Sequence, residues 1–295
     1  MTINFAHGTR ICIMLCVLVF SGCARQEPLL EINVNAKAAM IVEAENGNIL
    51  FEKNPDRRFP PASTAKVMTA IVAIEHVPVM REITSSKKAV RVQPTVAGLR
   101  PGARYRLKDL ITAILIKSAN DAAIVIAEEV AGSEKEFARL MNATAKELGM
   151  EDTYFATATG LPTGKKDSQY TTVRDLAMMM RYALRYEIIL GAMRQKEAEI
   201  RGLDGRKIYL KTHNKALLWD PGAPWGKTGY TAEARRTFVG VNPSPEPRIV
   251  FAVLQSNDLW DDIITLNDQG LEIYRRDHRT FISDLIDWIK SERRR

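Results

Sequence analysis

The sequence predicts a mixed α/β (α+β) protein, with an antiparallel sheet built from both chain ends and an inserted all-helical subdomain. Three observations predict this fold class. Each end of the chain carries short apolar runs joined by turn residues, which is the pattern of a β-hairpin. Between the two ends, four segments repeat apolar residues at helical spacing. A further stretch from Val67 to Ile74 is almost entirely apolar, which is typical of a helix buried on nearly all sides.

The first residues of the chain resemble an export signal. An apolar run follows Arg10, is too short to span a membrane comfortably, and ends on small residues, as secretory signals do. Its end, Phe-Ser-Gly-Cys, resembles a bacterial lipobox, in which the cysteine becomes the lipid-bearing N-terminus. We therefore expect a signal peptide of the lipoprotein type over residues 1–22, a lipid on Cys23, and a tether over residues 23–37. Cleavage after Ala24 by an ordinary signal peptidase is the alternative.

Export also agrees with the use of cysteine. All three cysteines fall in the first 23 residues, so the folded body has no disulfide and no thiolate chemistry. We expect an exported protein that acts in the periplasm or another extracytoplasmic space and is held at the membrane by its N-terminal lipid anchor.

Two hairpin patterns predict the sheet. Over residues 38–54, two apolar runs are separated by Asn46 and Gly47, which is a strong hairpin signal. Residues 237–241 and 248–255 flank a proline-rich turn, where strand pairing cannot continue. We expect the two hairpins to share one sheet.

Four helical patterns predict the inserted subdomain. The third begins with a capping box, Ser133 with Glu136, and Thr172 with Asp175 repeats this relation at the start of the fourth. Such side chains satisfy free amide groups of the first turn and so mark where a helix begins. The four predicted helices cover residues 107–117, 121–132, 133–149 and 171–186.

The chain closes on two more helical patterns, over residues 261–277 and 279–295. We therefore expect a main domain over residues 38–275 and a C-terminal amphipathic, basic helix over residues 276–295. The apolar side of this last helix carries Phe281, Leu285, Trp288 and Ile289. Packing against the sheet is the commoner fate of such a helix, and lying on a membrane surface is the alternative.

Composition excludes several classes of function. At 295 residues and 46% apolar content, the chain can bury a large core as one domain or as two lobes that share an interface. The net charge of +7 is spread without the basic stripe and interleaved aromatic residues of a nucleic-acid-binding protein. It indicates either solubility or attraction to anionic envelope polymers or lipid headgroups. The histidines after the signal, His76, His213 and His278, lack metal-ligand spacing, so we expect no metal and no cofactor.

The chemistry is predicted by Ser63 and Lys66, at the start of the buried apolar helix. Pro60 and Pro61 place the start of that helix near Ser63. At this spacing the hydroxyl and the amine lie on one helical face. Burial favours the neutral amine, and a neutral lysine can take the proton of a neighbouring serine and make it a strong nucleophile. Free amides at the helix N-terminus would stabilise the oxyanion that forms.

A second Ser-x-x-Lys pair, Ser85 with Lys88, provides a comparison. This spacing is a common accident in a chain of average composition. The second pair lies in a short charged segment and is followed by no buried helix, so we interpret it as a solvated loop or strand edge.

Two further motifs follow along the chain. Ser118 and Asn120 lie at the junction of two predicted helices, where either residue could simply cap the second helix. Lys227, Thr228 and Gly229 begin a predicted strand, where a surface turn is the ordinary interpretation. Taken singly, each of these two motifs has an ordinary structural interpretation. Together with Ser-x-x-Lys they form an ordered set of three.

The set Ser-x-x-Lys, Ser-x-Asn and Lys-Thr-Gly resembles that of the penicillin-binding proteins and serine β-lactamases. Residues 98–123, 140–162 and 170–184 are similar to stretches of the low-molecular-mass penicillin-binding proteins, the D-alanyl-D-alanine carboxypeptidases and endopeptidases. The resemblance covers about residues 38–275. It implies a penicillin-binding transpeptidase or serine β-lactamase-like fold, with these residues as a serine D,D-peptidase catalytic domain.

The resemblance implies roles for the first two motifs. Ser63 would attack the carbonyl of the D-Ala-D-Ala bond that ends a peptidoglycan stem peptide, with Lys66 as its base. Ser118 would pass a proton to the leaving amine. Asn120 would orient Lys66 and hold the substrate's amide, since its side chain has both a donor and an acceptor. Water would then release the acyl group.

The resemblance assigns the third motif to the end of the substrate. Lys227 would face the terminal carboxylate, and Thr228 and Thr231 would hydrogen-bond it. Gly229 completes the motif. The backbone amides of the nucleophile and of Tyr230 would form the oxyanion hole. Tyr230 stands where many relatives carry histidine, which bears on substrate fit or pH behaviour.

These expectations favour a penicillin-sensitive D-Ala-D-Ala carboxypeptidase, with β-lactam antibiotics as covalent inhibitors and no nucleic-acid partner. A D,D-endopeptidase that cleaves D-Ala cross-links is the first alternative, since the chain stops before the β-rich C-terminal domain of many carboxypeptidases. A serine β-lactamase would need fast deacylation, which some achieve with an extra glutamate, and no segment is assigned to one. A non-catalytic penicillin-recognising envelope receptor would keep the motifs without turnover.

Overall fold

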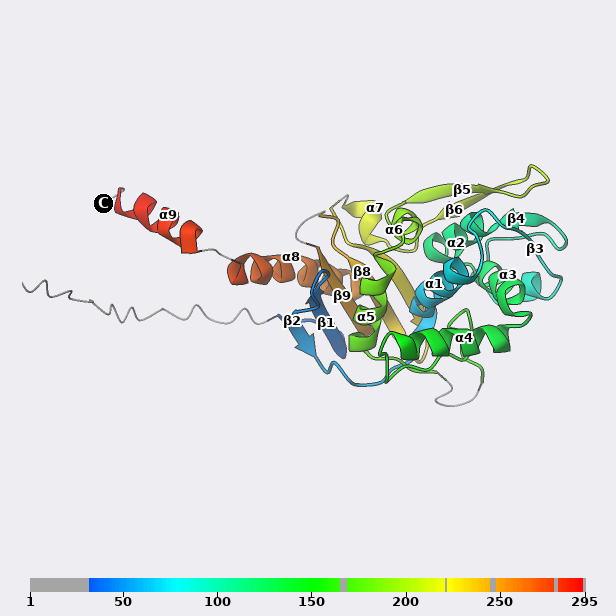
Figure 1. Ribbon diagram of the computed structural model, residues 1–295, viewed down its shortest axis with the longest axis horizontal. Helices are drawn as coiled ribbons and strands as arrows, with labels where there is room; N and C mark the ends of the chain where they lie inside the picture. The colour runs from blue at the N-terminus through cyan, green and yellow to red at the C-terminus, as the bar shows by residue number, and fades with distance from the viewer. Residues whose placement is uncertain (1–31, 165–168, 221, 245–247, 279–280, 294–295) are drawn as a thin grey trace, which may run out of the picture. The chain divides into compact units, whose positions relative to one another are not determined.

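A five-stranded antiparallel sheet lies at the centre of the computed structural model, which describes residues 32–164, 169–220, 222–244, 248–278 and 281–293. The strand order is β2-β1-β9-β8-β7, so strands from both ends of the chain pair with one another, as predicted (Figure 1). The two predicted hairpins are β1–β2 and β8–β9. The strands are β1 (Ala38–Glu43), β2 (Ile49–Lys53), β7 (Trp225–Thr231), β8 (Arg235–Val241) and β9 (Ile249–Ser256).

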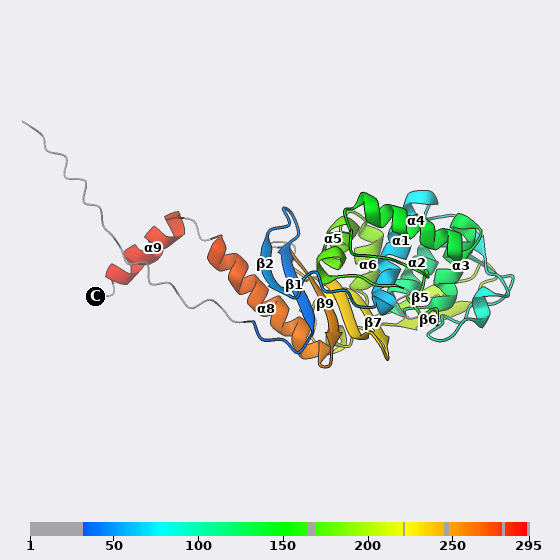
Figure 2. The same cartoon turned by 90° about the horizontal axis from the view of Figure 1, so that it is seen from below.

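Helices cover both faces of this sheet. One face packs against α8 (Leu259–Asp277) and the other against α5 (Val173–Ala183), and both helices contact β1, β8 and β9 (Figure 2). Every residue of β1 is therefore buried, and its sequence is a near-continuous apolar run instead of an alternating one. Gly270 lets α8 approach closely, because a Cβ there would lie 3.0 Å from the Cδ1 atoms of Ile41 and Ile249.

The helical subdomain forms around α1 (Lys66–His76), whose residues 66–73 are all buried. This helix packs against α2, α3, α4 and α5. The four helices predicted for the insertion are confirmed, and the hydroxyls of Ser133 and Thr172 accept from the backbone amides of Glu136 (3.2 Å) and Asp175 (3.1 Å). The remaining helices are α2 (Leu107–Ile116), α3 (Asn120–Ala131), α4 (Glu134–Glu147), α6 (Glu187–Met193) and α7 (Ala216–Trp219).

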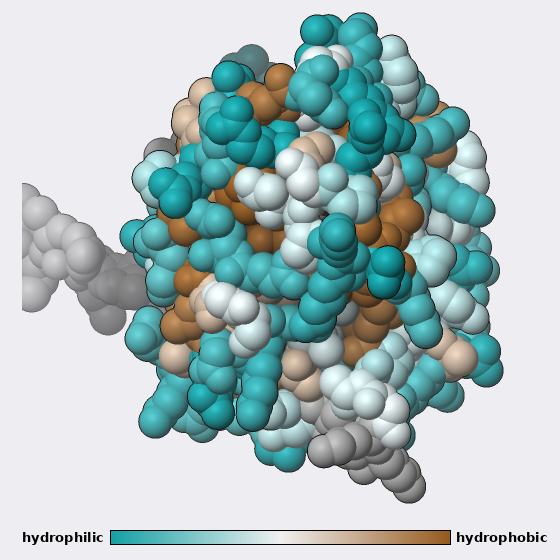
Figure 3. All heavy atoms as spheres, turned by 90° about the vertical axis from the view of Figure 1, so that its right-hand side faces the viewer, coloured by the Kyte–Doolittle hydropathy of each residue, from teal (hydrophilic) through white to brown (hydrophobic). Residues whose placement is uncertain are grey.

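Two small hairpins and two 3₁₀ turns were not predicted. They are β3 (Glu82–Thr84) with β4 (Arg104–Arg106), β5 (Glu197–Arg201) with β6 (Lys207–Lys211), η1 (Ala62–Ala65) and η2 (Ala89–Arg91). In β6 the apolar Ile208 and Leu210 alternate with Lys207, Tyr209 and Lys211, which is a strand signal in the sequence, and the structure buries the first set and exposes the second. The side of the molecule where β3, β4 and α3 lie is mostly hydrophilic, with apolar side chains in its recesses (Figure 3).

The ends of the chain are described only in part. The signal predicted over residues 1–22, Cys23 and most of the tether lie outside the described residues. Residues 32–37 belong to the folded body, because Ile32, Val34 and Ala36 are buried and the Asn35 amide donates to Asp262 Oδ1 at 2.6 Å.

At the other end, α8 continues to Asp277, and α9 (Phe281–Glu292) follows. In α9 the side chains of Ile286, Trp288 and Ile289 are 45%, 60% and 40% exposed, so these three are not buried against the sheet. We expected the apolar side of this helix to pack on the sheet. For Trp288 and Ile289 this prediction is wrong. Within the described ranges, no helix has the length and apolarity needed to cross a membrane.

Candidate active site

The first motif lies in the 3₁₀ turn η1, just before α1. The sequence predicted a helix start near Ser63, whereas the α-helix begins at Lys66. Ala62 opens η1 in the left-handed region, with φ of +48°, and the 3₁₀ turn over residues 62–65 separates it from the α-helix. Ser63 therefore lies just before the N-terminus of the α-helix. Its side chain is half-buried and lines a cleft.

Lys66 is the buried partner of this serine. Its Nζ lies 2.9 Å from Ser63 Oγ and donates to the carbonyl oxygen of Thr159 at 2.6 Å. Complete burial lowers the pKa of Lys66 well below its usual value, and the nearby charge of Lys227 lowers it further, while Glu134 opposes the shift. The amine is thus held towards its neutral form, with a lone pair available to the serine hydroxyl.

The segment around Thr159 positions the lysine, and sequence analysis assigned it no role. Gly160 has φ of +74°, and a Cβ at this position would overlap the carbonyl of Ala62. Both backbone polar groups of the neighbouring Ala158 are hydrogen-bonded. Its amide donates to Glu134 Oε1 at 3.2 Å, and its carbonyl accepts from the Thr69 hydroxyl at 2.7 Å. The carbonyl that holds the amine is therefore fixed by packing that only the tertiary structure creates.

The second motif lies between α2 and α3. Ser118 is in the left-handed region with φ of +59°, a strained conformation for a serine, and its side chain reaches the cleft. Asn120 begins α3, and its Nδ2 donates to the carbonyl of Gln93 at 2.9 Å. Its Oδ1 is buried and has no hydrogen-bond partner among the described residues. Among the described residues, the Lys66 amine is hydrogen-bonded to Ser63 Oγ and to the carbonyl of Thr159, and Asn120 is not one of its partners.

The third motif lies on β7, the edge strand of the sheet next to η1. Thr228 and Tyr230 line the cleft, whereas Lys227 is 1% exposed and its Nζ donates to the Thr228 carbonyl at 2.5 Å. Burial lowers the pKa of Lys227 to about 7. Gly229 faces Ser63, and a Cβ there would lie 2.8 Å from the Ser63 backbone nitrogen.

Thr231, which ends β7, is not among the side chains that line this cleft in the described structure. Its Oγ1 accepts from the Ala234 amide at 3.0 Å, inside the turn to β8. The structure thus brings Ser63, Ser118 and Thr228 to one surface and uses the Thr231 hydroxyl elsewhere.

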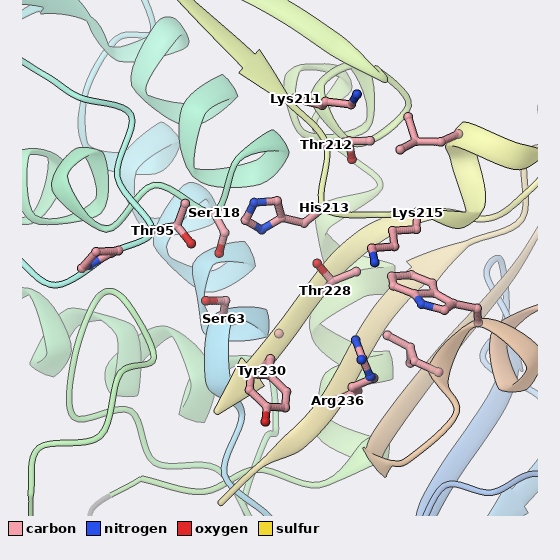
Figure 4. Close-up of a pocket in the computed structure, with 15 residues that line it drawn as sticks. Ser63, Thr95, Ser118, Lys211, Thr212, His213, Lys215, Thr228, Tyr230 and Arg236 are labelled. Carbon is pink, nitrogen blue, oxygen red and sulfur yellow. The ribbon is translucent and has the colours of Figure 1, made fainter. Parts of the chain in front are cut away.

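The cleft has a volume of about 600 Å³ and a cationic wall that sequence analysis missed. Figure 4 shows Ser63, Ser118 and Thr228 around one space, with basic side chains beyond Thr228. Among the described residues that line the cleft none is acidic, and Lys211, His213, Lys215 and Arg236 are basic. Burial, followed by the charge of Lys227, lowers the pKa of His213 to about 4, so its imidazole is neutral at neutral pH.

This arrangement has the parts of an acyl-transfer site. An edge strand can pair with an extended peptide, and β7 runs past Ser63 in η1. Ser63 has a neutral amine within hydrogen-bond distance, which is the pairing that activates a serine hydroxyl. The basic wall suits a carboxylate. In the described ranges no cluster of three or more histidine, cysteine or acidic side chains could hold a metal ion.

These features are those expected of a serine acyl-transfer site on a mixed helix-and-sheet fold, and comparison with known proteins identifies the family. The chain belongs to the D-alanyl-D-alanine carboxypeptidase family, Peptidase_S11, whose family model matches residues 23–258. It is 33% identical to the D-alanyl-D-alanine carboxypeptidase DacF of Bacillus subtilis over 76% of this chain. The aligned region covers 58% of that relative, so the chain spans less than two thirds of its length.

Solved structures confirm the predicted fold class. The crystal structure of a D-alanyl-D-alanine carboxypeptidase from Mycobacterium tuberculosis H37Rv has a TM-score of 0.76, with 28% identity over 81% of this chain and 92% of that chain. The Streptomyces K15 DD-transpeptidase has a TM-score of 0.75, with 23% identity over 81% of this chain and 98% of that one. At this lower identity the second structure supports the fold alone.

Proposed function

We propose that the protein is a serine-type D-Ala-D-Ala carboxypeptidase, which acts on peptidoglycan stem peptides through an acyl-enzyme on Ser63 and is inhibited by β-lactams. The observation that carries the proposal is the 2.9 Å pairing of Ser63 Oγ with the buried Lys66 amine beneath a cationic cleft. Family membership supports D-Ala-D-Ala as the substrate class.

Acylation begins with the neutral Lys66 amine. It takes the Ser63 proton as the serine oxygen attacks the carbonyl carbon of the scissile amide. The backbone amides of Ser63 and Tyr230 stabilise the oxyanion, each donor by about 3 kcal/mol. When the C–N bond breaks, the proton returns from Lys66 through the Ser118 hydroxyl to the leaving amine, and D-Ala departs.

The leaving residue carries the terminal carboxylate. Thr228 can donate a hydrogen bond to it from β7, and Lys215 and Arg236 supply positive charge from the cleft wall. Lys227 lies behind Thr228, where its protonation strengthens the local field. The Oδ1 of Asn120 is buried without a hydrogen-bond partner among the described residues, and it is an acceptor for a substrate amide.

Deacylation by water restores the serine, and its rate separates a peptidase from a β-lactamase. A β-lactamase of the kind that uses a glutamate needs that carboxylate to position the water. Among the described residues, Glu134 is the acid whose charge acts on Lys66, but its carboxylate accepts from the Ala158 amide and does not line the cleft. This favours the slowly deacylating peptidase.

We also propose that the protein acts outside the cytoplasm as a lipoprotein. The lipobox-like end of the apolar N-terminal run supports a lipid on Cys23. Metabolic labelling of the full chain with a fatty-acid analogue should mark the wild type and leave the Cys23→Ala variant unlabelled. Equal labelling of both would overturn the lipid assignment.

The experiment that tests the activity combines intact mass after benzylpenicillin treatment with D-Ala release from a peptide ending in D-Ala-D-Ala. The wild type should form a stable adduct and release D-Ala, and Ser63→Ala should do neither. Ser85→Ala removes the other Ser-x-x-Lys serine, whose hydroxyl donates to a backbone carbonyl, and should keep the adduct.

Other results would assign other functions. Labelling that persists in Ser63→Ala removes this residue as the nucleophile. A transient adduct with rapid loss of the drug indicates a β-lactamase. An adduct without any D-Ala release indicates a penicillin-recognising receptor.

A further inference from the structure

The residue that directly follows the second motif, Asp121, is a buried carboxylate. It is 1% exposed, and it is not among the described side chains that line the cleft. A carboxylate at this depth needs hydrogen-bond donors, because burial removes the water that would solvate it. Asp121 accepts from four backbone amides, and the first is that of its neighbour Ala122, which donates to Oδ1 at 2.9 Å.

The other three amides belong to the segment over residues 93–99, which we call the 93–99 loop. Asp121 Oδ1 accepts from the Ala97 amide at 2.8 Å. Its Oδ2 accepts from the amides of Gly98 and Leu99, at 2.9 and 3.0 Å. Gly98 has φ of +88°, and a left-handed residue of this kind lets successive amides converge on one anion. The loop is thus folded around the carboxylate.

The 93–99 loop in turn holds Asn120 of the second motif. Its Thr95 carbonyl accepts from the backbone amide of Asn120 at 2.7 Å, and its Gln93 carbonyl accepts from Asn120 Nδ2 at 2.9 Å. A carbonyl oxygen only accepts, so the second bond fixes which way the side-chain amide of Asn120 points. Its Oδ1 is therefore left for another donor, and it has no partner among the described residues.

The same loop forms part of the cleft. Pro94 and Thr95 line it, and Figure 4 shows Thr95 on the Ser118 side of the cleft, away from Thr228. A substrate that pairs with the free edge of β7 faces this wall. The loop has no helix or strand of its own, so its position depends on the bonds that hold it.

We propose that Asp121 is a positioning residue, which acts through the 93–99 loop to hold Asn120 Oδ1 where it accepts from a backbone N–H group of the substrate. The inference rests on the proposed function, because it concerns the same cleft and the same substrate. The nucleophile is held by other contacts, since the Lys66 amine is bound to Ser63 Oγ and to the carbonyl of Thr159. Loss of the Asp121 bonds should therefore weaken recognition of the substrate N–H group and leave the nucleophile intact.

The bonding pattern makes Asp121→Asn a sharp perturbation. Each carboxylate oxygen accepts from two of the four amides, and each accepts from at least one amide of the 93–99 loop. Whichever way an asparagine side chain turned here, its NH₂ group would face two N–H donors in place of an acceptor. The loop would lose at least one bond, although the side chain keeps its size and shape.

A second variant, Gly98→Ala, disturbs the loop and leaves Asp121 in place. A Cβ at Gly98 would meet no atom within 4 Å, so the substitution acts through the positive φ alone. Gly102→Ala is its matched control, because Gly102 has φ of +79°, is equally open and lies outside the loop. Asp109→Asn is the control for charge, because Asp109 lies in the first turn of α2, which packs against α3.

The test compares two substrates that release D-Ala by cleavage of the same kind of amide bond. They are an N-acyl-D-Ala-D-Ala peptide and its O-acyl-D-lactyl-D-Ala analogue, in which an ester oxygen replaces the N–H group of the residue that acylates the serine. We would measure kcat and KM for both substrates in the wild type and the four variants, with thermal unfolding and benzylpenicillin acylation in parallel. The wild type should prefer the N–H substrate about tenfold or more in kcat/KM.

Asp121→Asn and Gly98→Ala should each lower kcat/KM for the N–H substrate about tenfold, mainly through KM, and keep the analogue within about twofold of the wild type. Gly102→Ala and Asp109→Asn should keep the wild-type preference. If Asp121→Asn does not fold, the comparison of Gly98→Ala with Gly102→Ala decides. Equal losses on both substrates, an unchanged preference, or no preference in the wild type would overturn the inference. Failure of the wild type to release D-Ala and to be acylated would overturn the proposed function itself.

Discussion

The close approach of β7 to the nucleophile yields a sharp prediction for Gly229→Ala. The added Cβ would lie 2.8 Å from the Ser63 nitrogen and 3.0 Å from Ala62 Cβ, and it would overlap the Thr237 hydroxyl. Ordinary contact begins at 3.4 Å, so the strand and the turn η1 must separate by about 0.6 Å. Overpacking of this kind costs about 1–3 kcal/mol of stability.

The effect on chemistry should exceed the effect on stability. A displacement of about 1 Å in an active site can lower the rate about 100-fold, so a shift of this size should slow acylation by roughly 10- to 100-fold. The assay is the time course of benzylpenicillin adduct formation by intact mass, with thermal unfolding measured in parallel. Gly191→Ala is the control, because its Cβ would meet its nearest neighbour, Glu187 Oε1, at 3.9 Å on a helix. Wild-type acylation by Gly229→Ala would refute the claim that β7 positions Ser63.

Two further predictions follow from the buried lysines. Because Glu134 raises the pKa of Lys66, Glu134→Gln should shift the acidic limb of the kcat/KM profile for D-Ala release to lower pH; an unchanged or upward-shifted limb would contradict this role. The folded-state pKa of Lys227 is about 7 against 10.5 unfolded, so the unfolded chain binds more protons between these values and stability rises with pH there. Lys227→Met should therefore raise the free energy of unfolding at pH 7 by roughly 1–4 kcal/mol in urea titrations, with a gain that shrinks towards pH 10, while the KM for carboxylate-bearing substrates rises. A destabilised variant would show that Lys227 is not held at an energetic cost.

Local signals in the sequence predicted much of the fold. The Asn46-Gly47 turn, the caps at Ser133 and Thr172, and the apolar periods of the four inserted helices depend on neighbours within a few residues, and each is found where the sequence predicted it. The α-helix start near Ser63 was placed three residues early, because residues 62–65 form the 3₁₀ turn η1, which begins at the left-handed Ala62 and lies close to Gly160 in a distant segment.

The motif residues could be named from the sequence because their spacing is itself local or matches a known order. The residues that contact them in the folded protein could not be named from the sequence. The carbonyl of Thr159 that holds Lys66, the use of the Thr231 hydroxyl by a turn, and the wall of His213, Lys215 and Arg236 all depend on which segments the sheet and helices bring together.

The sequence by itself thus determined the order of the elements, the candidate nucleophile and base, and the family, since these depend on residue type and short-range spacing. Only the tertiary structure decided the low pKa of Lys227, the close approach of Gly229 to Ser63, and the basic side chains that line the cleft. Burial and the proximity of charges depend on residues that are far apart in the chain. The distances between such residues are set only when the chain folds.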